Sequence, residues 1–203
     1  MARIKAVLFD VGNVIIPWSQ ANLFRKIFPD PERLTYFLTE VVPFSWHDRH
    51  DAGVSFADNR AERLKLFPQF ADELLAYDTR FEEMLGDVVP ETIAVIEELH
   101  ALSVPLYALT NMPAEKAELV FSKIPVFSHF QDVIISAQEK LIKPDPRLYD
   151  ITLQRIGYPA EAIFFTDDSP KNIAAAQAKG FVTHPFDDPK ALRPALVAAG
   201  VLS

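Results

Sequence analysis

Four short runs of apolar residues recur along this chain, and polar residues follow each of them. The runs are Ala6–Phe9, Leu106–Leu109, Val133–Ile135 and Ala162–Phe165. Each run is too short for a helix and is apolar nearly throughout. This pattern is typical of strands that are covered on both faces in a parallel sheet. We expect a fifth strand at Phe181–Thr183.

Amphipathic helical patterns lie between and after the later runs. They cover Glu91–Leu102, Ala114–Ser122, Arg147–Ile156, Pro170–Lys179 and Pro189–Ala199. Several begin at or next to a proline, which is tolerated in the first helical turn because its missing N–H would have no partner there. The alternation of strand and helix predicts an α/β fold with a doubly wound, Rossmann-like parallel sheet.

The stretch from Pro17 to about Gly86 interrupts this alternation. It has helical periodicity, as in Phe56–Leu64, but no convincing strand. It also follows the first predicted strand directly, where a doubly wound fold normally has a short loop. We therefore predict a small all-helical cap at residues 17–86, inserted into an α/β core made of residues 1–16 and 87–203. The alternative is that these helices belong to the core itself.

Composition narrows the classes of partner. Lys and Arg number 20 against 28 Asp and Glu, a net charge of −8, and no basic run occurs, so nucleic acid and anionic membranes are not expected partners.

The chain has no cysteine, and its apolar stretches are shorter than the roughly 18 residues a membrane helix needs. The apolar N-terminal run is broken by Asp10, Gly12 and Asn13, which favours a buried strand over a signal peptide. We expect a cytoplasmic protein, a monomer or a homodimer.

Polar residues follow the predicted strands at the positions where open α/β sheets bind ligands, beyond the carboxyl ends of the strands. The segments are Asp10-Val11-Gly12-Asn13, Thr110-Asn111, a loop that contains Lys143, and Thr166-Asp167-Asp168-Ser169. Each alone could be a turn or a helix cap. Core packing requires polar groups at none of these four places, so together they predict one active site.

The same segments resemble, in order, the four motifs of the haloacid dehalogenase-like superfamily. The motifs are Val7–Val14, Leu109–Asn111, Lys143–Pro146 and Phe165–Asn172. The predicted helical insertion is similar to the small cap of that family. The resemblance implies a hydrolase of the phosphatase branch, and the wording Phe-Asp-x-Gly-Asn-Val is similar to phosphatases that act on sugar 1-phosphates.

The resemblance also implies roles for particular residues. Asp10 would attack phosphorus and form an aspartyl-phosphate. Lys143 would offset the charge of Asp10 and of the phosphate, and Thr110 and Asn111 would donate hydrogen bonds to the phosphate oxygens. The expected substrate is a small phosphorylated metabolite.

The resemblance also implies a magnesium ion. The physical reason agrees with it, since clustered carboxylates repel one another unless a cation lies among them. Mg²⁺ prefers oxygen ligands. The pattern assigns it Asp10, the backbone carbonyl of Gly12 and Asp168, with Asp167 assisting directly or through water. Asn172 falls where the pattern often has a further aspartate, and we expect it only to support these ligands.

The chain departs from the phosphatase pattern at Gly12, where most members carry an aspartate that protonates the leaving group and then activates water. General acid–base assistance is typically worth about 10²–10⁴-fold. Three interpretations follow: a phosphatase whose acid comes from elsewhere, a metal-independent 2-haloacid dehalogenase, or a degenerate, non-catalytic binding protein. The pair Asp167-Asp168 argues for a metal and against the dehalogenase, whose motif carries serine and asparagine there.

The predicted cap contains one segment with acid–base groups, Trp46–Asp51. We hypothesise that it closes over the site, that His47 or His50 donates the missing proton, and that Arg49 binds a substrate anion. The alternative is an exposed polar turn or helix face.

Overall fold

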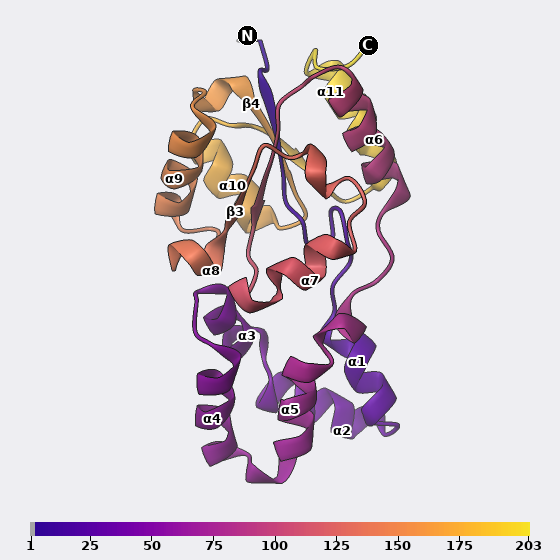
Figure 1. Cartoon of the computed structure of the whole chain (residues 1–203), viewed down its shortest axis with the longest axis vertical. Coiled ribbons are helices and arrows are strands. Elements are labelled where there is room, and N and C mark those ends of the chain that lie inside the picture. The colour runs from indigo at the N-terminus through magenta and orange to yellow at the C-terminus, as the bar shows by residue number, and fades with distance from the viewer. Residues whose placement is uncertain (1–2) are drawn as a thin grey trace.

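The protein is divided into two lobes, one above the other in Figure 1. The computed structural model describes residues 3–203, so the first two residues of the predicted core segment 1–16 lie outside it. The upper lobe contains a five-stranded parallel sheet of order β3-β2-β1-β4-β5. The strands are β1 (Ala6–Phe9), β2 (Leu106–Thr110), β3 (Asp132–Ile135), β4 (Ile163–Asp167) and β5 (Val182–Pro185).

Helices cover both faces of this sheet. Successive strand side chains point to opposite faces, and β1 shows this directly. Val7 and Phe9 pack with residues of α6 (Pro90–Ala101) and α11 (Pro189–Ala198). Ala6 and Leu8 pack with residues of α9 (Pro146–Ile156) and α10 (Pro170–Ala178). The predicted doubly wound α/β fold is therefore confirmed, and burial on both faces explains why the strands are apolar without alternation.

The lower lobe is built from helices. They are α1 (Gln20–Ile27), α2 (Pro31–Tyr36), α3 (Phe44–Asp51), α4 (Phe56–Leu66) and α5 (Ala71–Thr79), with short helical turns at Phe37–Val41, Pro68–Phe70 and Phe81–Met84. The side chains of Ser19, Asp30 and Ser55 accept backbone N–H groups at the starts of α1, α2 and α4, as N-cap residues do. Residues 17–86 thus carry helices and no strand, and we keep the division into core and cap as our interpretation.

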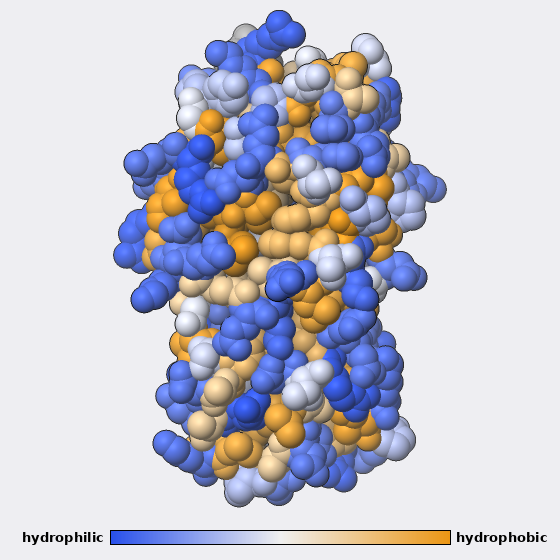
Figure 2. All heavy atoms as spheres, in the orientation of Figure 1, coloured by the Kyte–Doolittle hydropathy of each residue, from blue (hydrophilic) through white to orange (hydrophobic). Residues whose placement is uncertain are grey.

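The chain passes between the lobes along two adjacent segments. Trp18 and Leu85 form an isolated antiparallel bridge, and the N–H of Gly86 donates to the carbonyl of Pro17 over 2.8 Å. We call the boundary between the two lobes the waist. The short core helices α7 (Ala117–Ser122) and α8 (Ser136–Glu139) lie on the upper side of this boundary (Figure 1). Figure 2 shows hydrophobic surface at the waist, bordered by hydrophilic surface on both lobes. Within residues 3–203, no helix is both long and apolar enough to cross a membrane.

Candidate active site

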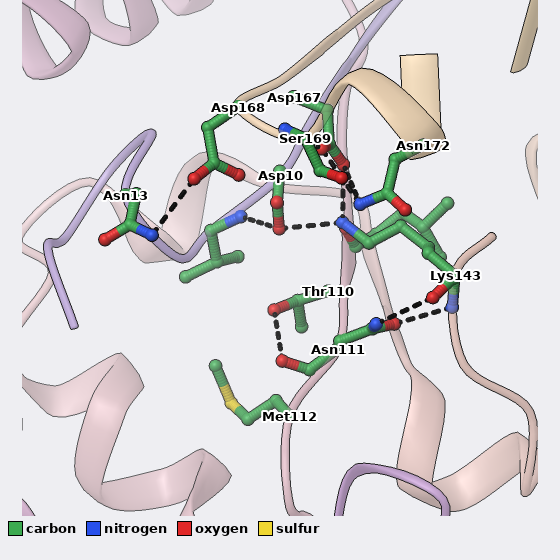
Figure 3. A network of polar contacts seen from close by, with 12 residues as sticks. Asp10, Asn13, Thr110, Asn111, Met112, Lys143, Asp167, Asp168, Ser169 and Asn172 are labelled. Carbon is green, nitrogen blue, oxygen red and sulfur yellow. Dashed lines mark hydrogen bonds and ion pairs between the residues drawn. The ribbon is translucent and has the colours of Figure 1, made fainter. Parts of the chain in front are cut away.

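The carboxyl ends of the parallel strands bring the predicted polar residues together (Figure 3). Asp10 directly follows β1, Thr110 ends β2, and Asp167 ends β4 and is followed by Asp168. Lys143 comes from the segment that leads into α9. Asp10, Thr110, Lys143 and Asp168 line a pocket of about 440 Å³ together with residues from the cap. Asp167 is not part of the pocket lining.

Lys143 connects two of the carboxylates. Its Nζ lies 2.9 Å from Asp10 Oδ1 and 2.7 Å from Asp167 Oδ2, and it donates to the carbonyl of Leu109 over 2.9 Å. All three ammonium protons therefore have an acceptor. Burial alone would lower the pKa of Lys143, but the attraction of Asp10 and Asp167 outweighs it and the pKa is raised. Lys143 is a fixed positive charge at neutral pH.

Asp10 is the carboxylate that this charge holds in place. Its Oδ1 accepts from Lys143 and, over 2.6 Å, from the N–H of Val11. These contacts leave Oδ2 for an electrophile in the pocket. Burial raises the pKa of Asp10, Lys143 lowers it, and Asp167 raises it again, with a net increase. The nucleophilic, ionised form thus depends on further positive charge in the site.

Asp168 and Asp167 have different surroundings. Asp168 Oδ2 accepts from Asn13 Nδ2 over 3.0 Å, and Asn13 itself adopts a left-handed backbone with φ 58°, which asparagine tolerates better than most residues. Asp167 is fully buried and accepts hydrogen bonds from Lys143, Asn172 and the N–H of Ser169. Asp168 thus keeps an open side toward the pocket, whereas Asp167 mainly orients Lys143. The predicted supporting part of Asn172 agrees with its contacts to Asp167.

The donor set fits a hard divalent cation. Asp10, Asp167 and Asp168 each offer an oxygen within 4.8 Å of the others. Three carboxylates against one ammonium leave two negative charges uncompensated in this cluster. Burial, and then the repulsion of Asp167, raise the pKa of Asp168, although Asn13 opposes the increase. A cation among these oxygens would remove the repulsion, and carboxylate oxygens are the ligands that Mg²⁺ prefers.

Thr110 and Asn111 lie at the same pocket but differ from each other. The buried Thr110 hydroxyl has only a 3.4 Å contact with the carbonyl of Asn111, so it is available to a ligand. The Asn111 amide instead donates to the carbonyl of Lys143 over 3.0 Å and accepts the Lys143 N–H over 2.7 Å. Asn111 thus fixes the Lys143 backbone, and the second proton of its amide nitrogen is left for a ligand, so its contact with phosphate stays a prediction.

The cap contributes one helix face to the pocket. Phe44, His47, Asp48 and Asp51 of α3 line it, at the i, i+3, i+4 and i+7 spacing of a single face. Arg49 lies on the opposite side, since each residue advances about 100° around the helix. It forms a 2.7 Å ion pair with Glu62 and does not line the pocket. The prediction that Arg49 binds the substrate is wrong for this reason.

The two histidines of α3 are both buried, which overturns the alternative of an exposed turn. His50 lies inside the cap, stacked on Phe56 at 4.1 Å, and its ring nitrogens contact Val54 O and Asn59 Nδ2. It therefore cannot donate a proton in the pocket, and that prediction is wrong. His47 does line the pocket and stacks on Trp18 at 4.4 Å. Burial, with a smaller effect of His50, lowers the pKa of His47 to about 3, so its ring is neutral at pH 7.

Most of the remaining pocket wall is apolar. The apolar residues are Val11, Ile16, Trp18, Phe44, Phe81, Leu85, Met112, Pro113, Val120, Ile142 and Pro144, and the polar ones are Asn13, Ser169, Lys171 and Asn172. They come from the core, from the cap and from the two connecting segments, so the pocket is completed only where the lobes meet. Phe44 is 68% exposed at this place. The pocket thus combines a charged end at the sheet with an apolar wall that suits the organic part of a ligand.

A family model described as haloacid dehalogenase-like hydrolase matches residues 4–180. The chain belongs to this family. The glyceraldehyde 3-phosphate phosphatase of Methanopyrus kandleri is 29% identical over 200 residues, covering 89% of this chain and 82% of that protein. The sesquiterpene phosphatase astK of Aspergillus oryzae is 26% identical over 180 residues, covering 88% and 87%.

A solved structure has the same fold as this family member. It is a HAD family enzyme of Bacteroides thetaiotaomicron, determined in complex with magnesium and inorganic phosphate. The TM-score is 0.69 at 22% identity, and the match covers 93% of this chain and 98% of that chain. At this identity the similarity concerns the fold alone.

The sequence of this haloacid dehalogenase-like hydrolase does not predict the roles of Asn13 and Asp51. Asn13 holds Asp168, and its place beside Gly12 in the first motif was the only signal for it. Asp51 lies buried in the pocket wall, and a helical phase for α3 could have put it on the same face as His47. At Gly12 itself, no described atom lies within 4 Å of an added Cβ. A Cβ at this position would therefore meet open space, and the acid is missing.

Proposed function

We propose that this hydrolase is a Mg²⁺-dependent phosphatase that hydrolyses a small phosphomonoester through an aspartyl-phosphate on Asp10. The observation that carries the proposal is the position of Asp10. Its carboxylate is fixed by Lys143 at 2.9 Å and lies at the base of a pocket, in a cluster with Asp167 and Asp168. A nucleophile, a cationic clamp and a cation site are the parts that phosphoryl transfer requires.

In the first step Asp10 Oδ2 attacks phosphorus as the bond to the leaving oxygen breaks. Lys143 keeps the carboxylate oriented and offsets its charge, and Thr110 donates its hydroxyl to a phosphate oxygen. In the second step water attacks the same phosphorus, and the bond to Asp10 breaks. A magnesium ion held by Asp10, Asp168 and the carbonyl of Gly12 would supply electrophilic stabilisation of the phosphoryl oxygens.

The pocket wall bears on the substrate class. Its volume of about 440 Å³ suits a small metabolite. The polar side chain of Asp48 offers a hydrogen-bond partner for hydroxyl groups, in agreement with a sugar phosphate, while Trp18 and Phe44 provide apolar contact. The two curated relatives are phosphatases of glyceraldehyde 3-phosphate and of a sesquiterpene. We keep a sugar phosphate as the first substrate to test, and a cytoplasmic location as part of the proposal.

The experiment is a phosphate-release screen over a panel of phosphorylated metabolites, with and without Mg²⁺, on the protein and on Asp10→Asn. We expect turnover that needs Mg²⁺ and is lost in Asp10→Asn. Chloride release from 2-chloropropionate without metal would establish the dehalogenase instead. Binding of a phosphorylated ligand without any turnover would establish the non-catalytic binding protein. Either result would overturn the phosphatase.

A further inference from the structure

A phosphatase of this kind needs a proton for its leaving group, and Gly12 cannot supply it. The titratable side chains on the cap face of the pocket are His47, Asp48 and Asp51. We propose that Asp51 is the general acid of the first step and the general base of the second, in place of the missing residue at position 12. This inference rests on the phosphatase function proposed above.

The position of Asp51 is the first argument. It is the last residue of α3, lines the same pocket as Asp10 and is only 5% exposed. Its Oδ1 has no hydrogen-bond partner among residues 3–203. Buried carboxyl oxygens are normally hydrogen-bonded. An oxygen in a pocket wall whose described polar contact is the 3.5 Å approach of His47 Nε2 is therefore placed to receive a ligand.

The attachment of Asp51 to the core is the second argument. Ser136 Oγ donates to the carbonyl of Asp51 over 2.7 Å and accepts the N–H of Met112 over 3.0 Å. Met112 is two residues beyond Thr110, at the end of β2. Gly53 lies against the core as well, because an added Cβ there would lie 2.8 Å from the carbonyl oxygen of Ala137. The cap therefore reaches the core at Asp51, and these contacts fix the Asp51 backbone against the segment that follows β2.

A chain of hydrogen bonds faces Asp51 from within the cap. Gln20 Nε2 donates to the Tyr77 hydroxyl over 2.8 Å, and that hydroxyl lies 2.8 Å from His47 Nδ1. We assign the one hydroxyl proton to the bond with Nδ1, which places the proton of the neutral imidazole on Nε2. Nε2 lies 3.5 Å from Asp51 Oδ1. His47 is thus a positioning residue whose N–H stabilises Asp51 when Asp51 is ionised.

Charge agrees with this geometry. The groups that face Asp51 are His47 and Asp48 of its own helix, Tyr77 of α5 and Lys143 of the core. Burial, and then Asp48, raise the pKa of Asp51 to about 8, although Lys143 opposes the increase. Asp51 is therefore protonated at neutral pH and can donate. His47 is neutral and holds its one proton in the chain described above, so it is not the donor.

The proton balance is as follows. As Asp10 attacks and the bond between phosphorus and the leaving oxygen breaks, the Asp51 proton moves to that oxygen and the alcohol departs. Asp51 is then a carboxylate. It takes a proton from the water that attacks the aspartyl-phosphate, the bond between phosphorus and Asp10 breaks, and phosphate leaves with Asp51 protonated again.

The test uses two aryl esters, phenyl phosphate and 2,4-dinitrophenyl phosphate. Phenolate is a poor leaving group that needs a proton, whereas dinitrophenolate leaves without one. In Asp51→Asn we expect the rate of aspartyl-phosphate formation, measured by the release of phenol in a single turnover, to fall about 10²–10⁴-fold for phenyl phosphate. The dinitrophenyl ester should lose less than about tenfold. The matched control is Asp48→Asn, on the same helix face. It removes only the repulsion that helps to raise the pKa of Asp51, so it should slow the phenyl ester far less than Asp51→Asn does.

Two further readouts complete the test. The rate with phenyl phosphate should decline above about pH 8 in the unaltered protein, the value to which the Asp51 pKa is raised, and this decline should disappear in Asp51→Asn. Adding Gly12→Asp to Asp51→Asn should restore much of the phenyl phosphate rate, because a Cβ at position 12 meets open space and the new carboxyl lies two residues from Asp10. Equal losses for both esters, or an unchanged decline at high pH, would overturn the inference. If Asp10→Asn keeps full activity, the proposed function fails instead.

Discussion

Replacing Gly53 by alanine tests how closely the cap approaches the core. Gly53 has φ +96°, where a side chain is strained, and its added Cβ would lie 2.8 Å from the carbonyl oxygen of Ala137. Gly157, the residue after α9, provides the matched control. It has φ +75°, and within the described residues no atom lies within 4 Å of an added Cβ. The two positions thus share the backbone strain and differ in the steric contact.

The magnitudes follow from this difference. The left-handed backbone alone costs a residue with a side chain about 1–2 kcal/mol, so Gly157→Ala should lower the free energy of unfolding by that amount. Gly53→Ala should add the cost of displacing the Ala137 backbone, and overpacking of this kind typically costs about 1–3 kcal/mol. We expect Gly53→Ala to be the more destabilising variant by that second amount.

The assay is urea denaturation of both variants, followed by fluorescence and circular dichroism, with the slope of the transition used to check that it stays two-state. Gly53 is two residues from Asp51, so its variant should also turn over phenyl phosphate more slowly, while Gly157→Ala should not. Equal free energies of unfolding for the two variants would refute the close contact between cap and core.

Three other perturbations have defined outcomes. Lys143→Met leaves two buried carboxylates without their positive partner and should lower the free energy of unfolding by about 3–5 kcal/mol. Lys171→Met, at an exposed pocket residue, should change that free energy by no more than about 0.5 kcal/mol. Comparable urea midpoints for the two variants would contradict this. Asn13→Gly keeps the left-handed backbone but removes the amide from Asp168, so calorimetry should find Mg²⁺ bound about 10–100-fold more weakly, and unchanged affinity would exclude the role of that amide. The pKa of Asp51 is raised from its ordinary 3.8 to about 8, so the folded state holds a proton that the unfolded state has lost, and stability falls as pH rises through this window, by up to about 1.4 kcal/mol per pH unit. Asp51→Asn should make the slope shallower in a pH series of denaturation curves, since the raised pKa values of Asp10 and Asp168 remain, and a series parallel to that of the unaltered protein would refute the raised pKa of Asp51.

The corrections at the site share one cause. The residue types in Trp46–Asp51 indicate acid–base groups in the cap, but they do not show which side chain lies on which face. Once this segment is the helix α3, its 3.6-residue period turns His47 and Asp51 toward the pocket and Arg49 away from it. Similarly, the position of Asn111 after its strand predicts that it lies at the pocket, but not that its amide also binds the Lys143 backbone. The position of a residue along the chain predicts that it lies at the pocket. The direction of its side chain depends on the residues that pack against it in the folded protein.

The amino-acid sequence by itself determined the α/β fold and the edge of the sheet where Asp10, Thr110, Lys143 and Asp168 meet. Both follow from local rules, since apolar runs of strand length must be buried on both faces and parallel strands end on the same side. Only the tertiary structure decided which face of α3 meets the core, that His47 and Asp51 are buried there, and how far their pKa values move. These properties depend on contacts between residues distant in sequence, such as Ser136 with Asp51 and Tyr77 with His47, and a local pattern carries no information about them.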